Sequence, residues 1–210
     1  YGTKGTASPA NVPGGRYGAT SCVDPEGRVW VHGGYGIGAT SSGLLNDLWK
    51  WDGTNWTWVS GSDTPNQPGV YGTKGVAAAM NVPGARRNSA SWCDSNGDFW
   101  LLGGSGFPSA GPEGSLNDLW KWDGSSWTWI KGADTVGEEG VYGTKGLPGP
   151  ANEPGGRYGA IAGKDSSGAV RVFGGLRLSS TYRSYLLNDL WRWDGSEWTW
   201  LSGSNGAGEA

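Results

Sequence analysis

The sequence predicts an all-β protein built from three copies of one unit, each with four antiparallel strands. Glycine and tryptophan are unusually frequent, with 41 Gly and 15 Trp in 210 residues, whereas ordinary chains carry roughly 7% Gly. The glycines lack the every-third spacing of collagen, and large aromatics are rare in disordered chains. The repetition is direct, because two pentapeptides each occur three times. They are YGTKG at Tyr1–Gly5, Tyr71–Gly75 and Tyr142–Gly146, and LNDLW at Leu45–Trp49, Leu116–Trp120 and Leu187–Trp191. We therefore divide the chain into units 1–70, 71–141 and 142–210.

The first half of a unit predicts two strands joined by a tight turn. In unit 1, the small residues of Arg16–Asp24 form the first strand, and Pro25–Gly27 form the turn. Arg28–His32 is β-branched and aromatic, so it forms the second strand, which we expect to end at Gly33-Gly34. A loop rich in Gly and Ser follows.

The second half of a unit predicts a hairpin. Asp47–Trp51 and Trp56–Ser60 each alternate aromatic and other residues, and Asp-Gly begins the turn between them. By the two-residue period of a strand, the two tryptophans of each segment point to one face. Four antiparallel strands per unit, repeated along the chain, are typical of the blades of a β-propeller.

The repeated residues resemble the Kelch repeat, and the resemblance covers the whole chain. It rests on a di-glycine after an apolar strand, an aromatic residue in the next strand, a spaced tryptophan and an arginine that opens the first strand. These are Gly33-Gly34, Gly103-Gly104 and Gly174-Gly175; Trp51, Trp122 and Trp193; Trp56, Trp127 and Trp198; and Arg16, Arg86 and Arg157. The units are longer than the roughly 50 residues of a Kelch unit. The resemblance implies a Kelch-like propeller with three four-stranded blades per chain.

Three blades imply association, because propellers close with roughly four to eight. Open sheet edges and uncovered faces are association surfaces. We expect two chains to pair head to tail as a homodimer, completing a closed ring of 2 × 3 = 6 blades. Two alternatives stay open: a fragment of a longer propeller, or an engineered half-propeller.

Charge and hydropathy argue against other partners. The net charge is −3 without a block of like charge, so a nucleic-acid partner is not expected. The longest apolar run, Val76–Met80, is too short to span a membrane. The chain begins at Tyr1 without an initiator Met. This beginning is expected for a processed or excised piece, and an export signal removed before it would place the protein outside the cytoplasm.

The sequence predicts no catalytic, cofactor-binding or metal site. His32 is the sole histidine; it could act as a base or metal ligand, but its counterparts Leu102 and Phe173 favour a buried strand position. The recurring Asp47, Asp118 and Asp189 could bind cations, but with the Asn before each they are expected to hydrogen-bond the backbone where a loop enters a strand.

The two cysteines are expected to be free. Cys22 aligns with Trp92, and Cys93 aligns with Val23. The thiols therefore point to opposite faces of equivalent strands, which argues against a mutual disulfide and favours buried thiols.

A ligand, if there is one, is expected at positions that vary between units. We predict a non-catalytic binding scaffold for a protein or glycan ligand. The alternatives are a lectin whose exposed aromatic residues stack on sugars, and a fragment of a larger secreted Kelch-containing enzyme. The candidate ligand-binding residues lie in the loops after the di-glycines and at the start of the innermost strands. They are Tyr35, Phe107, Arg177, Tyr182, Arg183, Tyr185, Arg16, Arg86 and Arg157. The three arginines could line the mouth of the propeller channel or tie neighbouring blades together through backbone carbonyls, and we favour the tie.

Overall fold

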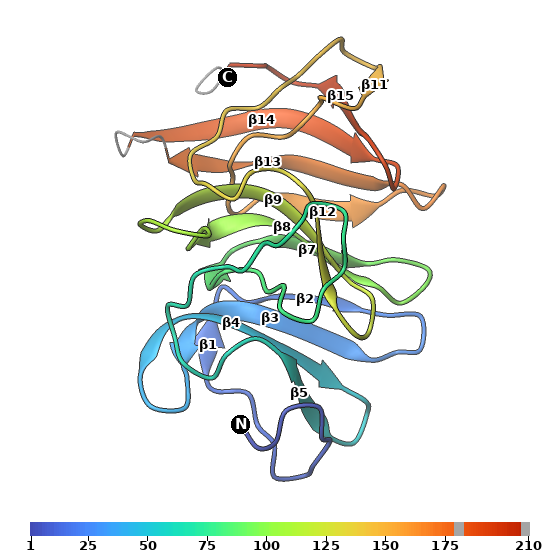
Figure 1. Cartoon of the computed structure of the whole chain (residues 1–210). Helices are drawn as coiled ribbons and strands as arrows, with labels where there is room; N and C mark the ends of the chain where they lie inside the picture. Colours follow the sequence, from blue (N-terminus) through green and yellow to red (C-terminus); the bar gives the residue numbers. More distant parts are fainter. Residues whose placement is uncertain (179–182, 207–210) are drawn as a thin grey trace.

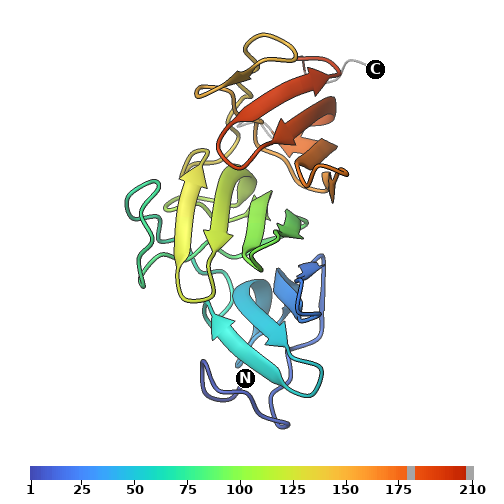
Figure 2. The same cartoon turned by 90° about the vertical axis from the view of Figure 1, so that its right-hand side faces the viewer.

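The protein is an all-β molecule in which three antiparallel sheets follow one another in chain order. The computed structural model describes residues 1–178 and 183–206, and these contain fifteen strands and no helix. None of the described residues lies in a helix able to cross a membrane. Figures 1 and 2 show the sheets side by side, with the two chain termini at opposite ends of the row. The arrangement is propeller-like.

The three sheets share one layout, in which two long strands form the middle and shorter strands flank them. Sheet 1 contains β1 (Arg16–Tyr17), β2 (Thr20–Val23), β3 (Val29–Ile37), β4 (Ser42–Trp51) and β5 (Trp56–Ser60). Sheet 2 contains β6 (Arg86–Arg87), β7 (Ala90–Cys93), β8 (Phe99–Gly106), β9 (Gly114–Trp122) and β10 (Trp127–Lys131). Sheet 3 contains β11 (Pro148–Gly149), β12 (Ile161–Lys164), β13 (Val170–Leu178), β14 (Ser184–Trp193) and β15 (Trp198–Ser202).

The hairpin at the end of each unit is confirmed. In sheet 1, β4 and β5 pair Trp49 with Trp58 and Trp51 with Trp56. The turn between them is held by Asp52, whose Oδ1 accepts hydrogen bonds from the backbone N–H groups of two turn residues at 2.8–2.9 Å. The Asp-Gly signal and the alternating aromatic residues were sufficient to predict this hairpin.

The first predicted strand is interrupted. Both β1 and β2 pair with β3, and Gly18 lies between them with a φ of 65°. Its carbonyl accepts a hydrogen bond from Asn88 N at 2.7 Å, so the interruption turns the backbone of sheet 1 toward sheet 2. A strand over the whole of Arg16–Asp24 was therefore wrong.

The second predicted strand does not end at the di-glycine. β3 continues to Ile37 through a bulge between His32 and Gly34, where Gly33 has a φ of 63°. A Cβ on Gly33 would lie 2.6 Å from the carbonyl oxygen of Arg86. The di-glycine therefore serves close approach of the next sheet, and a bulge re-aims the strand without ending it.

The opening YGTKG segment of each unit folds back onto the last strand of the same unit. The lysine donates to a carbonyl just after that strand and lies over its second tryptophan at 4.2–4.5 Å, a cation–π contact. Residues a few positions later pair with the strand itself. The opening segment thus pairs along the outer edge of each sheet, an addition to the four strands that the sequence predicted. The lysines are Lys4, Lys74 and Lys145.

Apolar side chains fill the two junctions between the sheets. Between sheets 1 and 2, the core includes Trp30, Leu48, Phe99 and Trp127. Between sheets 2 and 3, the equivalent positions are again buried, and the core includes Trp100. Most of the tryptophans therefore pack inside the molecule, which supports structural packing over sugar stacking for the repeated positions.

Candidate functional site

The outward face of sheet 1 carries apolar residues whose counterparts are buried in the other two sheets. Val31 is half-buried, whereas its counterparts Leu101 and Val172 are 0% exposed. The same holds for Val29, Trp51 and Trp56, which are half-buried although their counterparts in sheets 2 and 3 are between 0% and 6% exposed. This face has the side chains of a junction but no neighbour among the described residues.

The outward face of sheet 3 shows the complementary pattern. Phe173 is 48% exposed and Ile161 is 71% exposed. The counterparts of Phe173 are His32 and Leu102, each 1% exposed because the next sheet covers them. Leu190 is half-buried, although its counterparts are 0% exposed. Sheet 3 therefore ends in the opposite half of the same junction.

The di-glycine of sheet 3, Gly174-Gly175, faces no neighbouring sheet among the described residues. A Cβ on Gly103 would lie 2.7 Å from the carbonyl oxygen of Arg157, as Gly33 faces Arg86. At Gly174, the only described atoms within 4 Å of a Cβ belong to Leu187 of its own sheet, although its φ is also 61°. The backbone of sheet 3 thus keeps the conformation with which the first two di-glycines contact a neighbouring sheet.

A buried ion pair anchors each sheet internally. In sheet 2, the guanidinium of Arg86 donates to both oxygens of Asp118 at 2.6 and 2.7 Å and to the carbonyl of Gly103 at 3.0 Å. Tyr71 and Trp120 also donate to Asp118 Oδ2, at 2.6 and 2.7 Å. Sheets 1 and 3 repeat this arrangement with Arg16–Asp47 and Arg157–Asp189.

The electrostatics of these pairs favour the charged forms. In sheet 3, burial favours the neutral acid of Asp189. Hydrogen bonds and attraction from Arg157 outweigh burial and hold the pKa of the carboxyl below its ordinary value. Burial and the neighbouring carboxylate of Asp118 raise the pKa of Tyr71, so this hydroxyl remains a donor.

The three predicted arginines therefore lie inside their own sheets. The side chains of Arg86 and Arg157 are at most 1% exposed and that of Arg16 is 7% exposed. Their position corrects the expected channel-mouth placement, because the guanidiniums are used within the sheet. The expected tie between blades is also corrected, since each guanidinium donates to carbonyls of its own unit. The recurring aspartates accept from side chains, whereas Asn46 and Asn117 bind backbone N–H groups as predicted.

The other predicted ligand residues are dispersed. Tyr35 in β3 is 40% exposed and packs against Tyr17, and Phe107 is half-buried in the loop after β8. Arg177 is 9% exposed, pairs with Glu139 and lies over Tyr185. Arg183 is exposed immediately before β14, and Tyr182 lies outside the described residues. The structure thus joins Arg177 with Tyr185 but brings neither to Tyr35 or Phe107.

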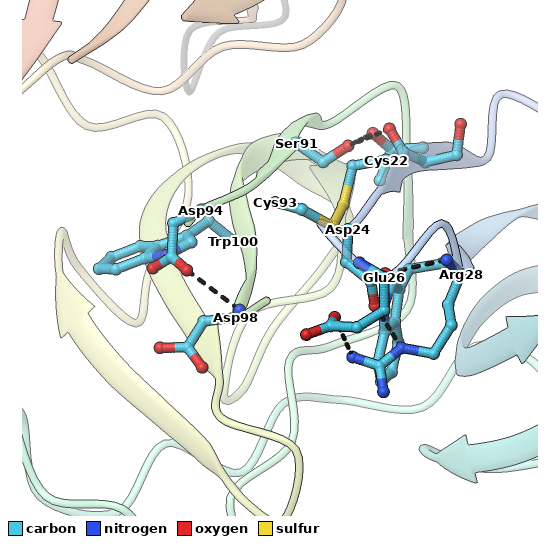
Figure 3. Close-up of a disulfide and its surroundings, with 12 residues drawn as sticks. Cys22, Asp24, Glu26, Arg28, Ser91, Cys93, Asp94, Asp98 and Trp100 are labelled. Atoms are coloured by element: carbon cyan, nitrogen blue, oxygen red, sulfur yellow. Dashed lines mark hydrogen bonds and ion pairs between the residues drawn. A yellow bond between two sulfur atoms is a disulfide. The ribbon is translucent and has the colours of Figure 1, made fainter. Parts of the chain in front are cut away.

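A disulfide joins Cys22 to Cys93, which corrects the prediction of free thiols. Figure 3 shows this bond between β2 and β7, beside the Asp24–Arg28 ion pair of the adjacent turn. The thiols do point to opposite faces of equivalent strands. In a row of sheets, however, the forward face of one sheet meets the rear face of the next, so opposite faces bring these side chains together.

His32 is buried between sheets 1 and 2, 1% exposed, beside the rings of Phe99 and Trp127. Neither ring nitrogen has a hydrogen-bond partner among the described residues. Burial lowers the pKa of His32 well below its ordinary value, and the positive charges of Arg86 and Arg16 add to this effect. The imidazole is therefore neutral and out of reach of a substrate.

Replacing His32 with leucine, the residue at the equivalent position of unit 2, is expected to make the free energy of unfolding depend less on pH below neutrality. Unfolded histidine takes up a proton near pH 6.5, whereas the folded protein does not. Protonation therefore stabilises the unfolded state as the pH falls. This lowers the free energy of unfolding of the wild type by about 2 kcal/mol at pH 5. Urea unfolding of both proteins between pH 5 and 7.5 measures this difference. Identical pH slopes in the two proteins would show that His32 does not titrate on unfolding.

Comparison with known proteins supports the fold alone. No family model matches the chain, and no curated protein matches it. Among solved structures, the chain is similar to that of YjhT, with a TM-score of 0.55 and 16% sequence identity. The match covers 92% of this chain and 54% of that chain, so this protein spans about half of the length of its structural neighbour.

Proposed function

We propose that this chain is half of a Kelch-like β-propeller, with each sheet as one blade, and that it acts as a non-catalytic binding scaffold. Two copies assemble head to tail into a closed ring of six blades. The observation that carries the proposal is the pair of outward faces. The outward face of sheet 3 carries the side chains of one side of a junction, and the outward face of sheet 1 carries those of the other side. Junctions with equivalent side chains occur twice within the chain, between sheets 1 and 2 and between sheets 2 and 3.

The two junctions within the chain indicate which residues would be in contact across the proposed junction between copies. His32 packs beside Phe99 and Trp127 across the first junction. The equivalent of His32 in sheet 3 is Phe173, and the equivalents of its neighbours are Val29 and Trp56 in sheet 1. Phe173 of one copy is therefore expected to insert between Val29 and Trp56 of the other.

Closure favours two copies. A head-to-tail contact either closes into a ring or continues as a filament, and six blades lie within the range in which propellers close. The similarity to a chain nearly twice as long is in keeping with half of a ring. A closed ring also leaves neither outward face exposed to unspecific association.

Light scattering tests the proposal. A dimer has a mass of about 44 kDa (2 × 22.0 kDa). Phe173→Asp is expected to reduce the mass to that of the 22.0 kDa monomer, because it would bury an unpaired carboxylate in the junction. Phe173 is 48% exposed in the single chain, so this variant should still fold.

Met80→Asp is the matched control, since Met80 is 77% exposed and lies outside both faces. It should leave the mass unchanged. A wild type that is monomeric at all concentrations, or a Phe173→Asp variant that dimerises like the wild type, would contradict the proposal.

A further inference from the structure

The junction between sheets 2 and 3 contains a groove of about 510 Å³. It is lined by β7 and β8 of sheet 2, by the end of β12, the start of β13 and the end of β14 of sheet 3, and by the turns at that end of both sheets. Its volume lies within the range of small-molecule sites. Among its lining residues is Trp92, the one tryptophan without a tryptophan counterpart in either of the other units.

The corresponding place between sheets 1 and 2 is closed. There, Cys22 and Cys93 form the disulfide, and a Cβ on Gly97 would lie within 4.0 Å of Pro25, Glu26 and Arg28 of the neighbouring turn. Figure 3 shows the disulfide with side chains of the two neighbouring turns.

The second junction replaces the two cysteines with Trp92 and Lys164. Gly168, the counterpart of Gly97, has no atom within 4 Å of its Cβ position, so the two turns stay apart. The junction between sheets 1 and 2 is thus closed here by the disulfide, whereas the equivalent place between sheets 2 and 3 is open.

The groove has a polar rim above the edges of buried tryptophan rings, since Trp92 and Trp100 are 5% and 7% exposed. The rings of Trp92 and Trp100 stack with an interplanar angle of 10°, and Trp193 packs against Trp100. Asp94 lines the groove and accepts a hydrogen bond from Trp100 at 2.8 Å. Its counterparts in the other sheets pair with arginines, whereas Asp94 forms no ion pair with a described residue.

The charges around the groove define the class of ligand. Lys164 is exposed on the rim and forms no ion pair with any residue in the described ranges. Asn96 and Asp194 also lie on the rim. Arg192 lines the groove as well, so two cationic side chains, Lys164 and Arg192, balance the two carboxylates of Asp94 and Asp194. A groove without net charge favours neither a phosphate nor a cation. The mixture of donors and acceptors over tryptophan edges suits a neutral ligand with many hydroxyl groups.

We propose that this groove binds a neutral saccharide unit. Apolar C–H groups of the sugar lie against the exposed ring edges of Trp92 and Trp100, and its hydroxyl groups bond to Asp94, Asn96 and Lys164. This inference is independent of the ring, because the groove lies within a single chain.

Titration calorimetry and saturation-transfer NMR test the site with glucose, galactose, N-acetylglucosamine, lactose and cellobiose. At least one of these is expected to bind saturably. Lys164→Ala and Asn96→Ala should each weaken binding about fivefold, as expected for one lost hydrogen bond. Both positions are exposed, so folding should not change.

Glu26→Ala is the matched control, because Glu26 occupies the position of Asn96 in the closed junction. It should leave sugar binding unchanged. Absence of saturable binding to the wild type would overturn the inference. Equal binding by the wild type and both groove variants would also overturn it, because the sugar would then bind elsewhere. Neither result alters the mass of the assembly, so failure here is distinguishable from failure of the proposed ring.

Discussion

Replacing Arg86 with methionine is expected to lower the free energy of unfolding by about 3–5 kcal/mol, the range for breaking a buried ion pair from one side. Arg86 and Asp118 each have side chains 0% exposed. Without the guanidinium, the carboxylate keeps, among the residues that the structure describes, the donors from Tyr71 and Trp120. It would therefore be buried without a compensating charge.

Two further variants separate charge from packing. Arg87 is adjacent in the sequence, but its side chain is 33% exposed, so Arg87→Met should cost less than about 1 kcal/mol. Adding Asp118→Asn to Arg86→Met should restore part of the loss, because the amide is neutral and still accepts from Tyr71 and Trp120. Denaturant unfolding followed by tryptophan fluorescence measures all three. An Arg86→Met protein within 1 kcal/mol of the wild type would contradict this role.

Removing the disulfide is expected to cost about 4 kcal/mol, the loop-entropy value for 71 residues. Cys22→Ser combined with Cys93→Ser should therefore unfold at lower denaturant concentration than the oxidised wild type.

Reductant provides the control. It should destabilise the wild type by a similar amount and leave the double-serine variant unchanged. If reductant does not change the unfolding of the wild type, the stabilisation by the Cys22–Cys93 link is contradicted. A stabilising disulfide would also agree with an oxidising compartment, which fits the hypothesis of export.

Local patterns were sufficient to predict the hairpin of each unit. Trp49–Trp58 pairing follows from alternation and an Asp-Gly turn, both of which are read within a few residues. The continuation of β3 through Gly33 was not predictable in this way. Its cause is the carbonyl of Arg86 in the next unit, and no periodicity within unit 1 reveals that approach.

The disulfide and the arginines show a second limit. Alignment of the units correctly placed Cys22 and Cys93 on opposite faces, but the inference needed the stacking of neighbouring sheets. An arginine and an aspartate recur together in every unit, 31 or 32 residues apart, which could have signalled the ion pair. The partner of a buried charge is set by three-dimensional packing. The residue types alone therefore did not decide whether the arginines tie neighbouring blades together or line the channel mouth.

A designed cross-link between copies tests the ring most directly. Cys22 and Cys93 have Cα atoms 5.6 Å apart, and their counterparts across the proposed junction are Gly163 of one copy and Val23 of the other. Gly163 has open space at its Cβ position, and Val23 is 61% exposed. The two positions should therefore meet the geometric requirement for a disulfide.

The measurement is non-reducing electrophoresis with peptide mass mapping of the Gly163→Cys, Val23→Cys double variant after mild oxidation. The account predicts a covalent dimer linked between positions 163 and 23, absent from each single variant and reversed by reductant. A double variant that remains monomeric under these conditions, or that links through other cysteines, would contradict the head-to-tail ring.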